Sequence, residues 1–129
     1  MTVVFDASAA VHLLIPSSVG ERVIERLRGE ADVLAPSLID TEVLSALARL
    51  ERAGEITRDE AERGVLAWQR FPCTRVPTMI EAIWRLRESV RVADGHYVAL
   101  AAVLKAPILT ADARLARAGL TGVSVLLVG

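Results

Sequence analysis

The chain has 129 residues and a formal net charge of −1, with 53% hydrophobic and 24% charged residues. This length and composition are typical of one folded domain and exclude a disordered chain. The charge lacks the strong positive excess of many nucleic-acid-binding domains, although all basic residues except Lys105 are arginine.

Strands and helices are predicted to alternate along the chain. In order, the sequence predicts a strand at 3–5, helices at 7–15 and 19–28, a strand at 32–35, helices at 36–53 and 58–71, a strand at 74–76, helices at 78–90 and 92–105, a strand at 107–110, a helix at 112–118 and a strand at 124–128. Helix ends are marked by Pro16, Gly29, Gly54 and Pro72, and a capping box begins at Thr57.

The predicted strands are short continuous apolar runs rather than alternating ones. Such runs are typical of a parallel sheet that is covered on both faces. We therefore expect an α/β fold with a central, mostly parallel β-sheet flanked by helices, in a single domain over 1–129. In sheets of this kind, the ligand site lies beyond the carboxyl ends of the strands.

The sequence also predicts the compartment. The longest apolar run, residues 97–104, is much shorter than the roughly 20 residues that cross a bilayer, so we expect no membrane partner. The N-terminus lacks the basic and apolar regions of a signal peptide. A lone cysteine, Cys73, cannot form an internal disulfide, so a cytoplasmic location is expected.

Four acidic residues are the candidate functional groups. Asp6 directly follows the first predicted strand, and Asp112 follows the strand at 107–110. Glu42 lies in the first turns of the long helix, and Asp94 lies at the start of the helix before the fourth strand. A parallel sheet would bring all four to one edge.

Two interpretations of these carboxylates remain open. Asp6, Asp94 and Asp112 each precede a plausible helix and could act as N-caps, and Glu42 could be a solvated helix residue. Alternatively, their repulsion is relieved by a divalent cation, and oxygen ligands without His or Cys favour Mg²⁺ or Mn²⁺. Such a cluster suits phosphodiester hydrolysis.

The segments around these acidic residues resemble the four acidic motifs of VapC-type PIN-domain ribonuclease toxins. The similar segments are Val4-Phe5-Asp6-Ala7-Ser8-Ala9, Glu42-Val43-Leu44-Ser45-Ala46-Leu47, Asp94-Gly95-His96-Tyr97-Val98-Ala99-Leu100-Ala101 and Leu109-Thr110-Ala111-Asp112-Ala113-Arg114-Leu115. They occur in the family's order and span nearly the whole chain, which makes the resemblance specific.

The resemblance implies a PIN-like fold and a Mg²⁺- or Mn²⁺-dependent endoribonuclease that acts as the toxin of a type II toxin–antitoxin pair. The residues implied as catalytic and metal-binding are Asp6, Glu42, Asp94 and Asp112. Ser8 and Thr110 match small hydroxyl positions beside the acidic site, where they would orient a carboxylate or a metal-bound water. Capping of a helix or turn is the alternative role for both hydroxyls.

The resemblance also implies partners: an RNA substrate (tRNA or rRNA), a second copy of the chain and a VapB-type antitoxin. The antitoxin groove would be lined by Leu13, Leu14 and residues 19–27, although core packing explains most of these residues as well. Five arginines are candidates for a phosphate track: Arg49, Arg52, Arg85, Arg87 and Arg91.

Other functions remain open. A PIN nuclease that matures or degrades RNA without an antitoxin would carry the same motifs, and an inactive PIN-like binding module could retain the fold. A haloacid-dehalogenase-like phosphatase would need a second Asp where Ser8 stands. His12 and His96 are expected to be structural or surface residues rather than bases, and Trp68 and Trp84 core or interface residues.

Overall fold

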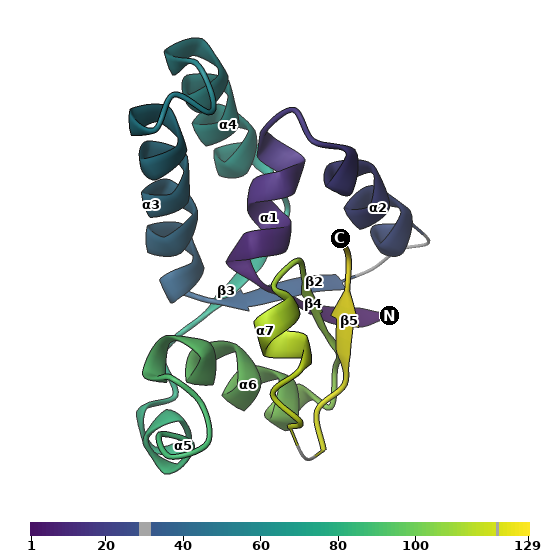
Figure 1. Cartoon of the computed structure of the whole chain (residues 1–129). Coiled ribbons are helices and arrows are strands. Elements are labelled where there is room, and N and C mark those ends of the chain that lie inside the picture. The colour runs from purple at the N-terminus through teal and green to yellow at the C-terminus, as the bar shows by residue number, and fades with distance from the viewer. Residues whose placement is uncertain (29–31, 121) are drawn as a thin grey trace.

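The computed structural model describes residues 1–28, 32–120 and 122–129, and its central element is a parallel five-stranded sheet (Figure 1). The strands are β1 (Thr2–Phe5), β2 (Asp32–Pro36), β3 (Thr74–Val76), β4 (Ile108–Thr110) and β5 (Val125–Leu127). Their order in the sheet is β3-β2-β1-β4-β5, and every neighbouring pair is parallel. The predicted mostly parallel sheet is therefore confirmed.

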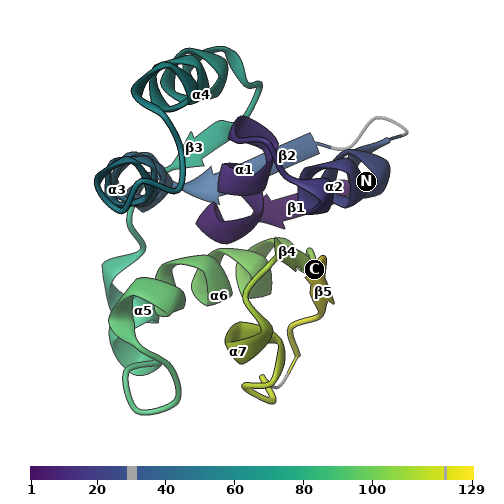
Figure 2. The same ribbon diagram turned by 45° about the horizontal axis from the view of Figure 1, so that its top comes forward.

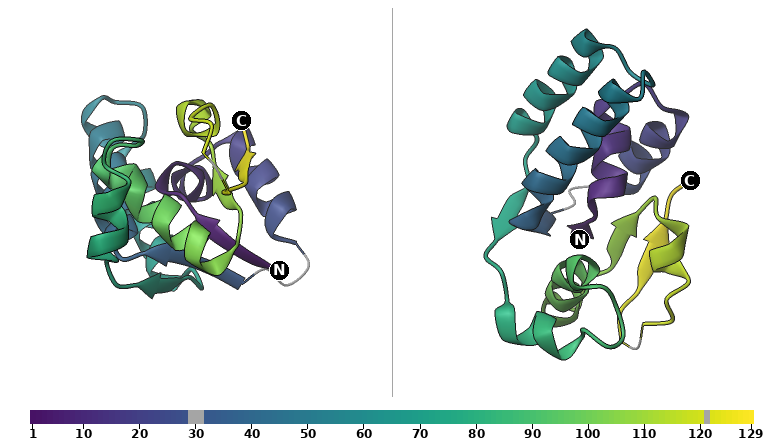
Figure 3. Two further views of the ribbon diagram at one scale, coloured as in Figure 1. Left: turned by 90° about the horizontal axis from the view of Figure 1, so that it is seen from below. Right: turned by 60° about the vertical axis from the view of Figure 1, so that its left-hand side comes forward.

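Helices cover both faces of this sheet. They are α1 (Ala7–Leu14), α2 (Ser18–Leu27), α3 (Leu38–Arg52), α4 (Arg58–Arg70), α5 (Ile80–Arg85), α6 (Val92–Leu104) and α7 (Ala113–Ala116). Helices α1 to α4 lie on one side, and α5 and α6 lie on the other, with α7 beside β4 and β5 (Figures 1 and 2). Figure 3 shows the same division from two further sides.

The strand order reverses beside β1. The chain runs outward from β1 through β2 to β3, then returns to place β4 on the other side of β1. At such a reversal the connecting helices diverge to opposite faces, and a crevice opens beyond the strand ends. The fold therefore directs a ligand site to the ends of β1 and β4.

The core is apolar and continuous around the central strand. Val3, Val4 and Phe5 are almost fully buried, as are Ile108 and Leu109 on the neighbouring strand. Such complete burial explains the continuous apolar runs in the sequence. Among the described residues, no helix has the length and apolar character required to cross a membrane.

One predicted helix is much shorter than expected. The interval 78–90 was predicted to be helical throughout, with Ile80 and Trp84 partly buried, but α5 ends at Arg85 and turns follow it. Ile80 is 77% exposed and Trp84 is 61% exposed, so these side chains bury little apolar area. Most of the stability of a helix comes from packing, and on this side it is α6 that packs against the sheet. The residues after Arg85 therefore gain little from continuing the helix.

Other boundaries differ by one or two residues. Pro36 ends β2 rather than beginning the next helix, and Asp112 precedes α7 as its N-cap. The predicted end of the second helix at Gly29 lies outside the described residues.

Helices α1 and α2 approach each other closely at Gly20. A Cβ atom built on Gly20 would collide with the backbone carbonyl of His12, which cannot move aside as a flexible side chain could. Gly20 is therefore required for the packing of these two helices.

We expect Gly20→Ala to lower the free energy of unfolding by about 1–3 kcal/mol, because the backbone of α1 or α2 must shift to accept the methyl group. Urea unfolding followed by circular dichroism measures this effect. The matched control is Glu21→Ala at the exposed neighbouring position, where a change below about 0.5 kcal/mol is expected. Equal stability of both variants would show that α1 and α2 are not packed as described.

Candidate active site

A cleft of about 640 Å³ lies at the carboxyl edge of the sheet, where the strand order reverses. Residues following β1, residues of α1 and α3, and residues near the starts of α6 and α7 line it. All four predicted carboxylates line this cleft: Asp6, Glu42, Asp94 and Asp112. Three arginines and a further carboxylate that was not predicted also line it: Arg49, Arg91, Arg114 and Glu55.

Asp6 directly follows β1. Its side chain is nearly buried, with 8% of the residue exposed. Its Oδ2 atom accepts hydrogen bonds from Ser8 Oγ at 2.6 Å and from Thr110 Oγ1 at 2.7 Å. Burial raises the pKa of Asp6, and the nearby Asp112 raises it further, while the two hydroxyls oppose this shift. The carboxylate is thus positioned firmly but is electrostatically unfavourable.

The two hydroxyl groups join the ends of β1 and β4. Ser8 Oγ accepts from the backbone N–H of Ala111 at 2.9 Å, and Thr110 Oγ1 accepts from that of Asp112 at 2.9 Å. Each hydroxyl has one proton, which it donates to Asp6, so the 3.0 Å contact between Ser8 and Thr110 is a consequence of shared partners. Both residues orient a carboxylate and also stabilise a turn.

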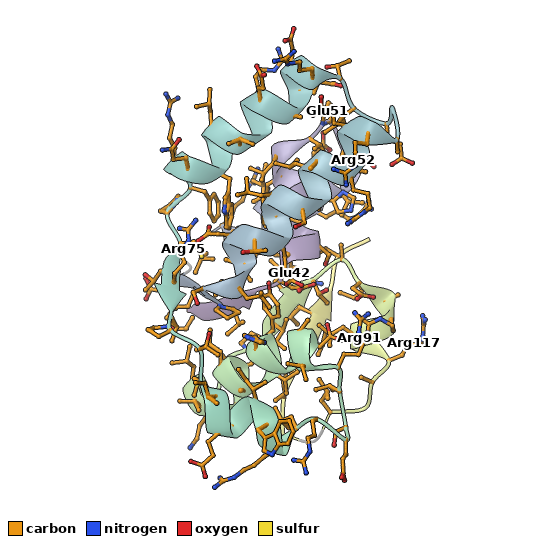
Figure 4. All side chains as sticks on the ribbon, turned by 90° about the vertical axis from the view of Figure 1, so that its left-hand side faces the viewer. Glu42, Glu51, Arg52, Arg75, Arg91 and Arg117 are labelled. Carbon is orange, nitrogen blue, oxygen red and sulfur yellow. The ribbon has the colours of Figure 1, made fainter. Side chains whose placement is uncertain are left out.

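Glu42 projects from α3 toward α6. Tyr97 Oη, on a residue that is 1% exposed, donates to Glu42 Oε1 at 2.6 Å. Burial raises the pKa of Glu42, and the neighbouring Asp6 and Asp94 raise it further, whereas the bond from Tyr97 lowers it. Burial and the bond to Glu42 also raise the pKa of Tyr97, which keeps the phenol protonated as a donor. Figure 4 shows Glu42 near the middle of the molecule, with Glu51 and Arg52 at the opposite end of α3.

Asp94 and Asp112 are paired with arginines. Arg114 contacts Asp94 Oδ2 with Nη1 at 2.9 Å and Asp112 Oδ2 with Nη2 at 2.8 Å, and Arg91 Nε donates to Asp94 Oδ2 at 3.2 Å. Burial alone would raise the pKa of Asp94, but the hydrogen bonds from Arg114 and Arg91 hold this pKa below its usual value. The arginines therefore favour the ionised form of Asp94, whereas burial disfavours it at Asp6 and Glu42.

The capping interpretation holds for one of the three aspartates. Asp112 accepts from the backbone N–H of Arg114 at 2.9 Å and is the N-cap of α7. Asp6 occupies the N-cap position of α1 but makes no side-chain cap hydrogen bond, and Asp94 lies inside the first turn of α6. Glu42 is half-buried rather than solvated. Capping thus leaves three of the carboxylates unexplained.

The donor set fits a hard divalent cation. The grouped acidic side chains and hydroxyls offer only oxygen, and burial with mutual repulsion raises the pKa of Asp6 and Glu42, a cost that a cation relieves. In their present positions, no three acidic, His or Cys side chains among the described residues are gathered closely enough to hold a metal ion. Asp94 and Asp112 share Arg114 instead.

The two histidines form their described hydrogen bonds with partners other than the site carboxylates. His12 lines the cleft, with its Nδ1 atom 2.7 Å from Ser17 Oγ. His96 is not among the lining residues, and its Nδ1 atom lies 2.9 Å from the carbonyl oxygen of Val92. Neither histidine forms a described hydrogen bond with a site carboxylate.

Three residues of the site were not predicted: Glu55, Tyr97 and Arg114. Tyr97 appeared only within the third similar segment, although its spacing of three residues from Asp94 could have suggested a shared site. Arg114 follows Asp112 by two residues, and sequence spacing cannot show that its guanidinium also reaches Asp94 on another helix. Of the five arginines proposed for a phosphate track, Arg49 and Arg91 line the cleft.

Comparison with known proteins identifies the family. A family profile described as PIN domain matches residues 3–120. Ribonuclease VapC9 from Mycobacterium tuberculosis (strain ATCC 25618 / H37Rv) is 35% identical over 121 residues, which covers 91% of each chain. Ribonuclease VapC12 from the same strain is 39% identical over 117 residues, or 89% of this chain and 90% of that protein. The chain belongs to the VapC ribonuclease family of PIN-domain proteins. The resemblance inferred from the four VapC motifs is therefore confirmed.

Solved structures support the fold of this VapC family member. A chain in the crystal structure of VapBC2 from Rickettsia felis, bound to a DNA fragment from the promoter, matches with a TM-score of 0.68 at 10% identity, covering 100% of both chains. A chain of a toxin–antitoxin complex from Klebsiella pneumoniae matches with a TM-score of 0.67 at 14% identity, covering 96% of this chain and 95% of that one. At these low sequence identities, the similarity shows that the folds are alike.

Asp6→Asn tests the electrostatic strain at the end of β1. A pKa raised in the folded chain means that ionised Asp6 opposes folding, so this contribution to stability falls as pH rises through the raised pKa. The asparagine carbonyl can still accept from Ser8 and Thr110. We expect the metal-free variant to have a higher Tm than wild type at pH 7, with the difference closing as pH falls to roughly 3–4.

The measurement is thermal unfolding in EDTA across this pH range. Asp32→Asn, at an exposed position on β2, is the matched control, and its Tm should stay close to that of wild type across the pH range. A lower Tm for Asp6→Asn at pH 7 would contradict the assignment of Asp6 as a strained carboxylate.

Proposed function

We propose that the chain is a Mg²⁺- or Mn²⁺-dependent endoribonuclease in which Asp6, Glu42, Asp94 and Asp112 hold the metal. The observation that carries this proposal is the grouping of the four carboxylates in one cleft, although they come from four separate parts of the sequence. Membership of the VapC ribonuclease family supports hydrolysis of RNA over other phosphodiester chemistry.

A bound divalent cation would activate water and offset the charge of the reacting phosphate. The chain's own residues hold the ligands in position: Ser8 and Thr110 fix Asp6, and Tyr97 fixes Glu42. Arg49 and Arg91 line the same cleft and supply positive charge for the RNA backbone.

We further propose that the chain is a toxin with a VapB-type antitoxin as its partner. Its fold matches chains in VapBC and other toxin–antitoxin complexes, and its VapC relatives match it over about 90% of their length. A cytoplasmic location and a single domain over 1–129 are part of the same proposal. Neither Leu13 nor Leu14 lines the acidic cleft, so an antitoxin groove that includes them would extend beyond it.

We expect Glu42→Gln to reduce RNA cleavage by more than about a hundredfold, because it removes a metal-binding charge. Its amide oxygen can still accept from Tyr97, so the hydrogen bond between α6 and α3 is kept. Cleavage of total tRNA and rRNA by the partner-free protein, with Mn²⁺ and with EDTA, measures the effect. Glu51→Gln, on the exposed far end of α3, is the matched control and should cleave like wild type.

Two alternatives would give different results. An inactive binding module would show no metal-dependent cleavage in wild type or in either variant. A nuclease without an antitoxin would cleave and lose activity in Glu42→Gln, but no small partner would co-purify with it from its native host.

The proposed homodimer has a candidate surface on α5 and the start of α6. Ile80, Trp84 and Val92 are 77%, 61% and 52% exposed, and they surround a small apolar hollow of about 240 Å³. An exposed tryptophan in an apolar cluster is typical of an interface centre. This surface lies on the opposite side of the sheet from α1 to α4, so dimerisation through it would leave those helices free (Figures 1 and 3).

We expect Trp84→Ala to weaken dimerisation by at least about tenfold, because tryptophans at interface centres contribute more than average. Sedimentation equilibrium across a concentration series measures the dissociation constant. Leu66→Ala, at a 52% exposed apolar position on α4, is the control and should dimerise like wild type. An unchanged dimer in Trp84→Ala would place the interface elsewhere.

A further inference from the structure

Arg114 bridges two of the carboxylates in the cleft. Its Nη1 and Nη2 atoms lie 2.9 and 3.4 Å from Asp94 Oδ2 and Oδ1, and Nη2 also lies 2.8 Å from Asp112 Oδ2. One guanidinium thus joins a residue on α6 to the residue that caps α7. The flat fork of arginine makes this double contact possible, whereas an ammonium group is a single point of charge.

The bridge lies at the boundary between the buried site and solvent. The side chain of Asp94 is 12% exposed, that of Asp112 is 31% exposed, and that of Arg114 is 47% exposed. Arg91 makes one weaker contact with Asp94, at 3.2 Å, from a side chain that is 70% exposed. Pairs formed by such exposed cations contribute little to stability, so they can be exchanged.

The carboxylate oxygens in this bridge are those that a cation would need. Asp94 Oδ2 accepts from both Arg114 and Arg91, and Asp112 Oδ2 accepts from Arg114. A divalent cation bound to these oxygens would repel a guanidinium that remained on them. Occupation by Arg114 and occupation by a metal are therefore mutually exclusive at these atoms.

We propose that Arg114 is the counter-ion of the metal-free site: it holds Asp94 and Asp112 in place until a divalent cation displaces it. This inference rests on the proposed metal-dependent function. Arg114 is a positioning residue here, and its presence sets the metal affinity below that of the same carboxylates without a bridging cation. It also prevents four like charges from facing one another when no metal is present.

The displaced guanidinium has a use in the proposed reaction. Arg114 stays within the cleft by its attachment to α7, next to Arg49 and Arg91 among the lining residues. Freed from its carboxylates, it presents paired N–H donors that match a phosphate group. Metal binding would therefore release the Arg114 guanidinium from Asp94 and make it available to bind the RNA backbone.

The test is a Mn²⁺ titration in which electron paramagnetic resonance measures free Mn²⁺. The proteins are wild type, Arg114→Gln, Arg114→Lys, Arg117→Gln and Glu42→Gln, all in the absence of RNA. Arg117 is exposed at the end of α7 and projects from the outer edge of the molecule, so it controls for loss of one positive charge (Figure 4). Circular dichroism confirms that each variant is folded before titration.

We expect Arg114→Gln to bind Mn²⁺ about fivefold to tenfold more tightly than wild type, because no guanidinium competes for Asp94 and Asp112. Arg114→Lys should also bind more tightly than wild type, since one ammonium nitrogen cannot reproduce the contacts that Nη1 and Nη2 make with Asp94 and Asp112. Arg117→Gln should bind as wild type does. Without metal, the Arg114→Gln variant should have a lower Tm than wild type. Mn²⁺ should raise the Tm of Arg114→Gln more than it raises the Tm of Arg117→Gln.

The outcomes separate this inference from the function on which it rests. Equal Mn²⁺ affinity in wild type and Arg114→Gln would overturn the counter-ion role while leaving the metal site intact. An equal gain in Arg117→Gln would also overturn it, because the effect would then be one of net charge. No Glu42-dependent Mn²⁺ binding in wild type would overturn both the metal site and this inference.

Discussion

A buried negative charge at the end of the central strand is the constraint on which the rest of the site depends. Asp6 leaves β1 with 8% of its surface exposed, in a cleft that also contains Glu42, Asp94 and Asp112. Burying several like charges together is costly unless each finds a partner. The structure meets this cost with short-range partners of three kinds: hydroxyl groups, a phenol and guanidinium groups.

These partners divide the cleft into two parts. Asp6 and Glu42 accept only neutral donors, so burial dominates and their pKa values rise. Asp94 accepts from two arginines, which hold its pKa low. A cation entering the cleft would therefore gain most from the first pair, which has no guanidinium partner among the described residues, and would have to compete for the second.

The sequence allowed the fold and the positions of the acidic residues to be predicted for one reason. Strands buried on both faces leave continuous apolar runs, and in a parallel sheet the residues that follow β1 and β4 must lie at the same edge. Thus Asp6 and Asp112 could be placed at the same edge of the sheet without coordinates. The prediction of a helix over 78–90 was wrong in length because Ile80 and Trp84 suggested a buried helix face. The sequence alone does not show which apolar residues are covered by another element and which are exposed.

The partners of the carboxylates were harder to predict than the carboxylates themselves. Tyr97 and Arg114 act across elements, from α6 to α3 and from α7 to α6, and such contacts depend on side-chain direction. Net charge was similarly uninformative. A chain with a formal charge of −1 still places three arginines in its cleft: Arg49, Arg91 and Arg114.

The place of β1 in the sheet has a consequence for how the protein is made. Val4 pairs with Leu34 on one side and with Ile108 on the other, and Asp6 receives a hydrogen bond from Thr110, 104 positions later. During synthesis, the central strand keeps one edge unpaired until β4 has left the ribosome. A contact of such long range forms late and costs much loop-closure entropy. The acidic cleft is therefore among the last parts of the molecule to be completed, and no partial translation product that lacks β4 can contain it whole.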